Sequence, residues 1–462
     1  KSKAFSSDRN EYGNLPNTNT SPISLGHPGT LPVLNEKSAE YAVRLGLACN
    51  CDIRERNEFA RKNYFYADLP KGYQITQDTT PICTGGSISI KTPDGIAKNV
   101  GLTRIHMEED SGKSIHDLSP FETLIDLNRA GVPLLEIVSE PDMSSGDEAY
   151  AYLTEVRKLV RYLEVCDGNM EEGSLRCDAN ISVMKKGSKV YGTRVEVKNL
   201  NSIRNVKRAI EFEINRHISV LENGGEIKKV TLTFNAATGE TSIMRTKEEA
   251  DDYRYFPEPD LQPLTISQEY IQSIKSTMPP LPNELFSKYV HELKLSEYDA
   301  GVLTDDKYFA LYFEELLNHV ADAKNATNWM MGEVKGYLNE MAIEIDKFDC
   351  TPSRLAEVIN MVDEGTMGRS LASQQLFPLV VQHPSKSARA LAEEFQLVQV
   401  GNEDELQSWI QQALDKYPEK VQEYRGGKKG IIGLFMGEVM RLSQGKADPK
   451  ITSQLIQKAL DQ

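Results

Sequence analysis

The chain has 462 residues, a length that predicts about two to four domains. Acidic residues outnumber basic ones, 68 to 53, and the net charge of −15 excludes binding of nucleic acid through an overall basic surface. The six cysteines are scattered, a pattern typical of buried thiols in a reducing compartment. The sequence shows no secretory signal and no apolar run of about 18 residues, so we expect a cytoplasmic protein, or one of an organellar matrix or stroma in a eukaryote.

The two halves of the sequence differ in their patterns. Residues 1–275 mix strand patterns, turns and one clear helix, whereas residues 280–462 show helical patterns with short polar connections. The proline-rich segment 278–282 lies at the change, because its prolines are incompatible with a helix interior. A second break is expected near Pro384 or at residues 401–402.

The clear helix of the first half is expected to follow Ser144 and Ser145, which can cap its first turn. Apolar residues recur at helical spacing from Ala149 to Leu163, while charged residues occupy the other faces. We expect this helix to have a structural role only.

The segment 174–198 predicts a β-hairpin. Apolar residues alternate with polar ones from Leu175 to Val183 and again from Tyr191 to Val197, on either side of a turn at Gly187. One face of the hairpin is therefore apolar. The other face carries charged and amide side chains from both strands, namely Arg176, Asp178, Asn180, Arg194, Glu196 and Lys198.

If the hairpin is symmetric about Gly187, Asp178 lies opposite Glu196, and Arg176 lies opposite Lys198. Like charges directly opposite one another destabilise a sheet by roughly 0.2–1 kcal/mol per pair. A divalent cation between the carboxylates and a phosphate between the basic residues would offset this cost, and hard oxygen ligands favour Mg²⁺ over zinc. The hairpin alone leaves an equal alternative, a solvated strand face with another register.

An acidic segment, residues 105–114, sets one histidine and three acids beside Gly112, Lys113 and Ser114. It is not a P-loop, because Met107 stands where that motif needs a glycine. Its carboxylates are suited to a metal ion, and Lys113 is suited to a phosphate. The alternative, favoured for an isolated cluster of this kind, is an acidic turn on the surface.

Two further segments, 61–66 and 251–260, interleave aromatic residues with charged ones. The first is suited to stacking a base or the end of an acceptor stem, although buried aromatics between surface cations are the commoner explanation. The second contains Pro257 and Pro259, which predict an extended or turn segment that lines a cleft or wraps a domain.

The C-terminal segment 425–450 carries six basic residues and only two acidic ones, in contrast to the acidic chain as a whole. Its loop 426–430, rich in glycine and lysine, precedes an apolar helix. Such a loop at a helix start suits a phosphate backbone. A soluble linker with counter-charges is a nearly equal alternative.

Together these segments resemble the B subunit of the glutamyl/aspartyl-tRNA amidotransferases, and the resemblance covers essentially the whole chain. The long motifs that carry it are 16–20 (Pro-Asn-Thr-Asn-Thr), 31–35 (Leu-Pro-Val-Leu-Asn), 61–66, 106–114, 126–129 (Asp-Leu-Asn-Arg), 136–142 (Glu-Ile-Val-Ser-Glu-Pro-Asp), 170–180, 196–202 and 251–260. The loop 426–430 and the helix after it match the tail of the family.

The resemblance implies an α+β fold in three parts. These are a cradle-like domain of mixed and antiparallel strands with helices over 1–275, an all-helical domain over 276–395, and a small helical tail that binds tRNA over 396–462. It also implies the reaction: ATP phosphorylates the side-chain carboxylate of Glu-tRNA(Gln) or Asp-tRNA(Asn), and ammonia displaces the phosphate. A glutaminase partner, the A subunit, supplies the ammonia, and the small C subunit clamps the A and B subunits together.

The resemblance also favours the metal interpretation of the acidic segments, because phosphoryl transfer needs Mg²⁺ and cations around the moving charge. We therefore expect Glu109, Asp178 and Glu196 to bind Mg²⁺. Glu108 is expected as an alternative ligand and as part of the ATP site.

Three basic residues are expected to contact phosphate. They are Lys198, Arg176 and Lys113, which we expect to act both in ATP binding and in catalysis. No glutaminase signature is visible in the chain, which fits a partner that performs that step.

The chain departs from the family at two places. Family members usually open with a short strand carrying Glu-x-His, which supplies metal ligands; nothing corresponding precedes Lys1, so we expect further residues ahead of it. Some members also carry a four-cysteine zinc knuckle. The corresponding positions here are Ser6, Asp8, Ser21 and Ser24, and no zinc is expected.

From the residues alone, two other interpretations stay open. One is a non-catalytic tRNA-binding scaffold whose acids are structural, and the other is a metal-dependent nuclease. The resemblance decides for the catalytic component of an amidotransferase. Whether Glu-tRNA(Gln), Asp-tRNA(Asn) or both are substrates does not follow from the sequence.

Overall fold

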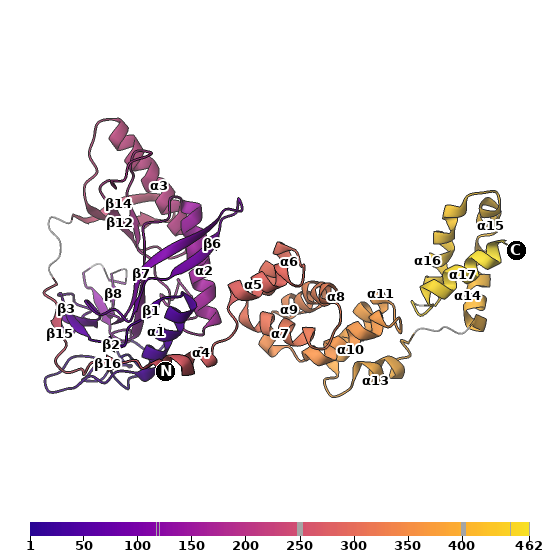
Figure 1. The fold of residues 1–462 in the computed structure, drawn as a ribbon, viewed down its shortest axis with the longest axis horizontal. Coiled ribbons are helices and arrows are strands. Elements are labelled where there is room, and N and C mark those ends of the chain that lie inside the picture. Colours follow the sequence, from indigo (N-terminus) through magenta and orange to yellow (C-terminus); the bar gives the residue numbers. More distant parts are fainter. Residues whose placement is uncertain (117, 120, 247–252, 399–402, 444, 462) are drawn as a thin grey trace. The chain divides into compact units, whose positions relative to one another are not determined.

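The computed structural model of the protein describes residues 1–116, 118–119, 121–246, 253–398, 403–443 and 445–461. Two compact units make up the chain, Lys1–Leu281 and Pro282–Gln462 (Figure 1). The first unit combines sheets with helices and the second is helical, which confirms the predicted α+β class. Among the described residues, no helix is both long and apolar enough to cross a membrane.

The first unit contains four helices and sixteen strands in its described residues. The helices are α1 (Glu36–Ala48), α2 (Gly146–Tyr162), α3 (Ile203–Glu222) and α4 (Gln268–Ser276). The strands are β1 (Asp52–Ile53), β2 (Arg56–Asn57), β3 (Ala60–Asn63), β4 (Tyr73–Thr76), β5 (Cys83–Thr84), β6 (Ser87–Lys91), β7 (Ala97–Glu109), β8 (Lys113–Ile115), β9 (Leu124–Asp126), β10 (Pro133–Ser139), β11 (Ala179–Ile181), β12 (Val195–Lys198), β13 (Val230–Asn235), β14 (Glu240–Thr246), β15 (Phe256–Pro257) and β16 (Leu264–Thr265).

The long strand β7 organises the largest sheet, in which the strands run in the order β1-β5-β7-β4-β3-β15. Strands β6 and β10 also pair with β7, both of them antiparallel. The β7–β10 ladder places Glu136 directly opposite His106 and Leu134 opposite Glu108. Because successive residues of a strand point to opposite faces, His106 and Glu108 share one face of β7, and Glu109 belongs to the other.

A second sheet has the order β11-β12-β13-β14. Strands β12 and β13 are parallel, and helix α3 forms the crossover between them. The alternation of apolar and polar residues in 174–198 does not predict that β12 has a parallel neighbour. Buried Val195 and Val197 belong to a core that also includes residues of α2 and of the larger sheet.

The predicted hairpin exists, but its predicted register is wrong. Asn180, rather than Asp178, pairs with Glu196, and Ala179 pairs with Val197. This two-residue shift keeps every side chain on its predicted face, since the side-chain period of a strand is two. It also removes the like-charge pairs on which the argument for a cation and a phosphate rested, because the ammonium of Lys198 contacts the carboxylate of Asp178.

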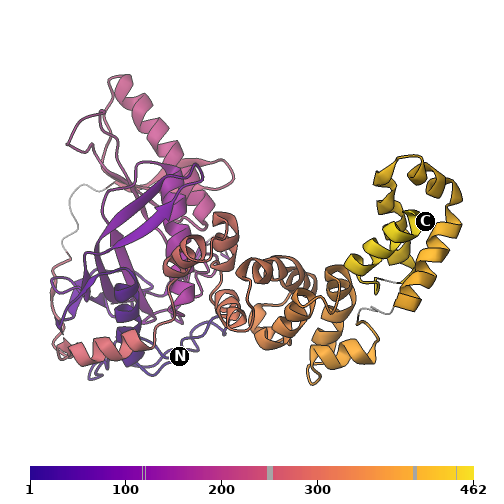
Figure 2. The same cartoon turned by 45° about the vertical axis from the view of Figure 1, so that its right-hand side comes forward.

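Helix α2 confirms the helix predicted after the two serines. The side chain of Ser145 accepts a hydrogen bond from the backbone N–H of Glu148, at 3.1 Å, and so caps the first turn. The carboxylate of Glu148 in turn accepts from the backbone N–H of Ser144, at 2.7 Å. The helix lies beside β6 and α3 in Figures 1 and 2, and it packs against both. Its buried residues belong to the core.

The second unit is helical throughout its described part. Its elements are α5 (Pro282–His291), α6 (Glu297–Leu303), α7 (Lys307–Leu317), α8 (Ala323–Trp329), the π-helix η1 (Met330–Val334), α9 (Lys335–Met341), the 3₁₀-helix η2 (Ile345–Lys347), α10 (Pro352–Asp363), α11 (Arg369–Leu371), the π-helix η3 (Ala372–Leu376), α12 (Phe377–Gln382), α13 (Ala388–Glu394), α14 (Glu403–Lys416), α15 (Pro418–Arg425), the 3₁₀-helix η4 (Lys429–Ile431), α16 (Ile432–Leu442) and α17 (Pro449–Asp461).

The change from mixed to helical structure falls at the proline-rich segment, since α4 ends at Ser276 and α5 begins at Pro282. Further along, helices α14 to α17 share a small hydrophobic core that includes Leu406, Phe435 and Ile456. A separate tail over 396–462 stays a prediction, because residues 399–402, which include the expected break at 401–402, lie outside the described residues.

All six cysteines are free thiols, and Cys49, Cys51, Cys83 and Cys350 are buried. Burial is the main cause of the raised pKa of Cys51, about 11, and of Cys49, about 12. A thiol with so high a pKa is a weak nucleophile at neutral pH. These four cysteines therefore act as small apolar side chains of the core, as predicted.

Candidate active site

Glu108 is the centre of a polar cluster on one face of the sheet, where β7 pairs with β4 and β10. Its side chain is only 7% exposed, yet its carboxylate is fully supplied with donors. Thr76 donates to it at 2.6 Å and Gln74 at 3.0 Å. The ammonium of Lys62 lies 3.9 Å away. A buried carboxylate needs such partners, and their number here indicates a built site rather than an accidental one.

His106 and Glu136 complete this cluster. The Nε2 atom of His106 lies 3.2 Å from Glu108 Oε1 and 3.3 Å from Glu136 Oε2, so one ring nitrogen faces two carboxylates. Ligand atoms of the three residues lie within 4.8 Å of one another. Among the described residues, this is the one group of three such side chains close enough to hold a metal ion together.

The protonation of His106 and that of Glu136 depend on one another. Burial by itself would lower the pKa of His106, but hydrogen bonds to Glu108 and Glu136 outweigh it, and the pKa is raised. The hydrogen bond from His106 likewise lowers the pKa of Glu136, against the effect of burial. The cluster therefore favours one positive charge between its two carboxylates; the proton on His106 supplies it, and a metal ion must displace that proton before the imidazole can bind it.

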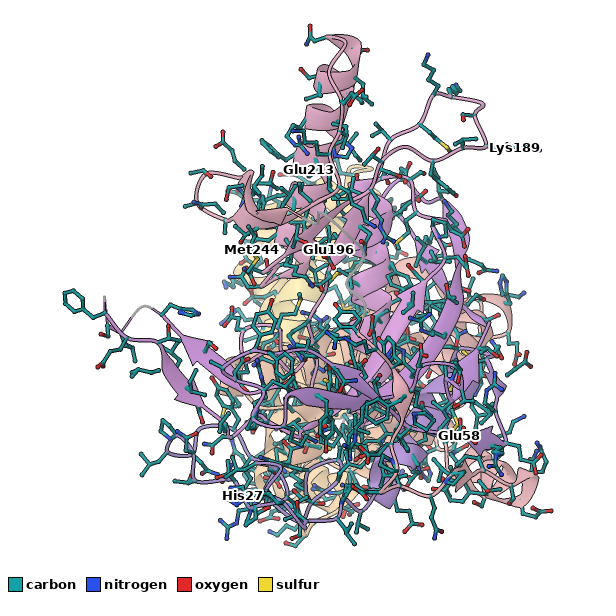
Figure 3. All side chains as sticks on the ribbon, turned by 90° about the vertical axis from the view of Figure 1, so that its left-hand side faces the viewer. His27, Glu58, Lys189, Glu196, Glu213 and Met244 are labelled. Atoms are coloured by element: carbon teal, nitrogen blue, oxygen red, sulfur yellow. The ribbon has the colours of Figure 1, made fainter. Side chains whose placement is uncertain are left out.

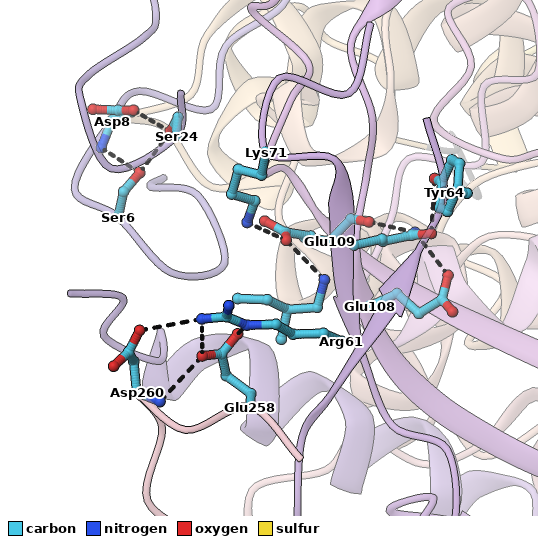
Figure 4. A network of polar contacts seen from close by, with 12 residues as sticks. Ser6, Asp8, Ser24, Arg61, Tyr64, Lys71, Glu108, Glu109, Glu258 and Asp260 are labelled. Atoms are coloured by element: carbon cyan, nitrogen blue, oxygen red, sulfur yellow. Dashed lines mark hydrogen bonds and ion pairs between the residues drawn. The ribbon is translucent and has the colours of Figure 1, made fainter. Parts of the chain in front are cut away.

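Glu109 lies on the opposite face of the same strand. It forms an ion pair with Lys71, and its Oε1 atom accepts a hydrogen bond from the backbone N–H of Ile75, at 2.8 Å (Figure 4). The alternative of an acidic surface turn at this segment is wrong, since Glu108 and Glu109 lie on β7, Asp110 directly follows it, and all three acids are buried. Glu108 and Glu109 thus belong to different environments despite being neighbours in sequence.

Asp178, Glu196 and Lys198 form a second group, on β11, β12 and the residues just before them. The ammonium of Lys198 contacts the carboxylate of Asp178 and lies 3.2 Å from that of Glu196. Burial would lower the pKa of Lys198, but the two carboxylates raise it. Figure 3 shows Glu196 on the sheet, with Lys189 far out on the loop between the strands.

Arg176 connects the second group to the larger sheet, because its guanidinium lies 2.6 Å from the carboxylate of Asp110. Asp110 directly follows β7 and also contacts Arg129, at 3.5 Å. Lys113 lies exposed on strand β8, where its backbone pairs with Asp126 of β9. The predicted phosphate-binding residues thus lie on three different segments, and their shared role stays a prediction.

Comparison with known proteins places this geometry in a family. Residues 1–272 match the family model described as the GatB/GatE catalytic domain, and residues 311–460 match that of the GatB domain. The chain is 49% identical over 461 residues to the B subunit of the aspartyl/glutamyl-tRNA(Asn/Gln) amidotransferase of Geobacter sulfurreducens, covering 99% of this chain and 96% of that protein.

The chain belongs to the family of aspartyl/glutamyl-tRNA(Asn/Gln) amidotransferase B subunits. Subunits of the same name from Chlorobium phaeobacteroides and Persephonella marina are each 46% identical to it. They cover 100% and 99% of this chain, and 96% of either relative is covered in return. The resemblance seen in the motifs is thereby confirmed, and with it the prediction of a tRNA-dependent amidotransferase subunit.

Sequence reasoning missed Glu136 and Lys62 as members of the site. Glu136 interrupts the apolar part of strand β10, residues 133–138, and a charged residue within such a run was the available signal. Its partner His106 is thirty positions away, and only the β7–β10 register brings the two together. Lys62 was noted in the aromatic segment 61–66, but its proximity to Glu108 depends on the pairing of β3, β4 and β7.

The positions that correspond to a zinc knuckle are partly linked by hydrogen bonds. The hydroxyls of Ser6 and Ser24 lie 3.1 Å apart, and Ser24 donates to the carboxylate of Asp8 (Figure 4). These are hydroxyl and carboxylate oxygens, whereas a structural zinc site is built from thiolate and imidazole ligands. The donor set at these positions therefore does not fit zinc.

Several basic residues of the C-terminal segment have acidic partners. Lys428 pairs with Glu423 at 3.1 Å, and Lys429 pairs with Asp461 at 2.9 Å. Both acids lie outside the segment 425–450, so the count of charges within that segment overstates the positive charge of the folded surface. The predicted role of this segment in binding tRNA stays a prediction.

Proposed function

We propose that this protein activates and amidates the side-chain carboxylate of Glu-tRNA(Gln), Asp-tRNA(Asn) or both, at the cluster around Glu108. A carboxylate oxygen of the substrate attacks the γ-phosphorus of ATP, and ADP leaves. Ammonia then attacks the carbonyl carbon of the acyl phosphate, and inorganic phosphate leaves. The full-length similarity to amidotransferase B subunits is the observation that supports the reaction.

The Glu108 cluster supports the placement of the cation that such chemistry needs. Two carboxylates and one imidazole within 4.8 Å of one another form a donor set that fits a divalent cation. We therefore assign Mg²⁺ to His106, Glu108 and Glu136. Bound there, Mg²⁺ would neutralise negative charge on the phosphate oxygens.

The predicted metal set of Glu109, Asp178 and Glu196 is less well prepared for a metal ion. Asp178 and Glu196 already share the ammonium of Lys198, and Glu109 is paired with Lys71. We propose instead that Lys198 and Arg176 supply positive charge to phosphate, since both side chains are partly exposed and each already pairs with a carboxylate. Lys113 remains a third candidate for that role.

The remaining parts of the proposal follow from the family. A glutaminase, the A subunit, delivers ammonia, and a small C subunit holds the two large subunits together. Helices α14 to α17 bind tRNA through Arg425 and the lysines of the loop 426–430, some of which must exchange their acidic partners for phosphate.

The proposal is tested by Glu108→Gln in the assembled amidotransferase, supplied with ATP, aminoacyl-tRNA and free ammonia. The variant keeps hydrogen-bonding capacity but loses the charge, so amidation should fall by more than about 100-fold while tRNA affinity stays unchanged. Glu140→Gln is the control for loss of a carboxylate, because Glu140 directly follows β10, is exposed, and accepts a hydrogen bond from Thr103, at 2.8 Å, outside the cluster. Normal amidation by Glu108→Gln would contradict the placement of the site.

A further inference from the structure

Two aromatic segments that are far apart in sequence lie side by side next to the candidate site. Strand β3 pairs with β15, with Arg61 opposite Phe256. The pairing continues beyond the strands, since the backbone N–H of Asn63 donates to the carbonyl of Tyr253, at 3.0 Å, and its side chain donates to that of Arg254, at 2.8 Å. The segments 61–66 and 253–260 therefore form one structural feature.

An ion pair with a fully buried acid stabilises the pairing of the two segments. The guanidinium of Arg61 binds the carboxylate of Glu258 in bidentate fashion, with both distances 2.7 Å, and it reaches Asp260 at 3.2 Å (Figure 4). The same guanidinium lies over the ring of Tyr73, 4.2 Å from its centre. Bidentate contacts of this kind fix geometry as well as supplying energy, so the two segments hold their aromatic residues in place.

Four tyrosines form a continuous row along this feature, and we call the row the tyrosine wall. Neighbouring ring centres are 5.8, 6.0 and 5.9 Å apart, and each pair meets edge to face. The wall consists, in order, of Tyr66, Tyr64, Tyr253 and Tyr255. Its two ends are open to solvent, with Tyr66 57% and Tyr255 41% exposed.

The wall borders the Glu108 cluster directly. Lys62 lies 5.1 Å from the ring centre of Tyr253 and 3.9 Å from the carboxylate of Glu108. The hydroxyl of Tyr64 donates to Gln74, at 3.0 Å, and Gln74 donates in turn to Glu108.

We propose that the tyrosine wall stacks the unpaired bases at the 3′ end of the aminoacyl-tRNA, and thereby delivers the esterified amino acid to Glu108. The proposal rests on the proposed function, which requires that end of the tRNA at this site. Aromatic rings with a neighbouring cation are the recurrent means of holding unpaired bases. A row of four rings is longer than one adenine requires. Its length therefore favours several nucleotides of the tRNA, rather than the single base of ATP, as the ligand of the wall.

The test compares Tyr66→Leu and Tyr255→Leu with Tyr66→Phe and Tyr255→Phe in the assembled amidotransferase. Leucine keeps an apolar side chain but removes the flat ring, whereas phenylalanine keeps the ring and loses only the hydroxyl. Tyr150→Leu is the matched control, because Tyr150 on α2 is also 41% exposed and does not belong to the wall. The probes are an intact tRNA and the same tRNA without its unpaired 3′ nucleotides.

We expect each leucine variant to raise the Kd for intact tRNA about 10-fold, and to leave the Kd for the shortened tRNA unchanged. The phenylalanine variants and Tyr150→Leu should bind both RNAs as the wild type does. Equal weakening of both RNAs, or wild-type affinity of the leucine variants, would overturn the proposal.

The KM for ATP shows whether the wall binds bases of the tRNA or the adenine of ATP. A raised KM for ATP in the leucine variants, with tRNA affinity intact, would show that the wall binds the adenine of ATP and would overturn the proposal in that form. The RNA affinities are measured without turnover. A wild-type complex that binds the 3′ end through the wall but forms no amide would therefore contradict the proposed function and leave the wall assignment standing.

Discussion

The two carboxylate groups of the first unit are held in different ways. Glu108 and its partners lie on the long β7–β10 ladder, where paired strands fix each side chain, and the buried acid has donors on several sides. Asp178 directly precedes β11, Glu196 forms the middle one of the three residue pairs between β11 and β12, and the two acids share one lysine. In the first group the two carboxylates share the ring of His106, whose proton a metal ion can displace, whereas in the second they share the ammonium of that lysine, whose whole side chain would have to move away.

This difference suggests that the first group binds the metal ion and that the lysine of the second group binds phosphate. A preorganised set of ligands loses little free energy to rearrangement when a metal ion binds, whereas a lysine that neutralises two acids must be displaced first. The lysine of the second group can instead reorient towards a phosphate, because its side chain is 30% exposed. The following predictions separate the two roles.

Of the two variants considered below, Lys198→Met should have a larger effect than His106→Gln. It removes the positive charge that we assign to phosphate, and kcat for amidation is expected to fall roughly 100-fold with little change in tRNA affinity. The measurement is single-turnover amidation with free ammonia.

Lys207→Met is the matched control for that experiment. Lys207 also contacts two carboxylates, those of Asp147 and Glu211, and its side chain is 32% exposed, but it lies on α3 and its two partners belong to α2 and α3 rather than to the predicted site. Equal losses in Lys198→Met and Lys207→Met would mean that general destabilisation, rather than loss of a phosphate contact, explains the result.

His106→Gln tests the electrostatics of the first group through stability, and its expected effect is smaller. The pKa of His106 is raised above 6.5, so its contribution to stability is full below pH 6.5 and is lost as the pH rises through the folded pKa. The pKa of Glu136 is lowered below 4.5, so its contribution is present above pH 4.5 and is lost as the pH falls through its folded pKa.

Both contributions are therefore present between pH 4.5 and 6.5, and the variant should differ most from the wild type in that window. We expect a difference in Tm of about 2–4 °C there, measured by calorimetry, and a smaller difference at about pH 8. A difference in Tm that is the same at every pH would contradict the coupling between His106 and the two carboxylates.

The contrast between the two groups also explains how far the sequence could be interpreted. Alternation in 174–198 predicted which side chains share a face, because that follows from the geometry of a single strand. It did not predict which residues pair, since the register depends on the connection between β11 and β12, and a two-residue shift leaves the apolar face unchanged.

The Glu108 cluster shows the corresponding limit for a site. Residues 106–109 were recognised as an acidic segment, but their separation onto two faces required knowing that the segment is a strand. The contribution of Glu136 depends on a pairing between strands that no local pattern encodes. The tyrosine wall is similar, because its two segments were each noted for their aromatic residues but only the β3–β15 pairing joins them.

The placement of the cation at Glu108 is tested most directly by measuring the affinity of the assembled amidotransferase for Mn²⁺, a spectroscopically visible substitute for Mg²⁺. The variants compared are Glu108→Gln and Asp178→Asn. We expect Glu108→Gln to weaken Mn²⁺ binding by more than about 100-fold and Asp178→Asn to change it by less than about 3-fold. If Asp178→Asn abolishes Mn²⁺ binding and Glu108→Gln retains it, the cation belongs to the second group and the roles proposed for the two groups are contradicted.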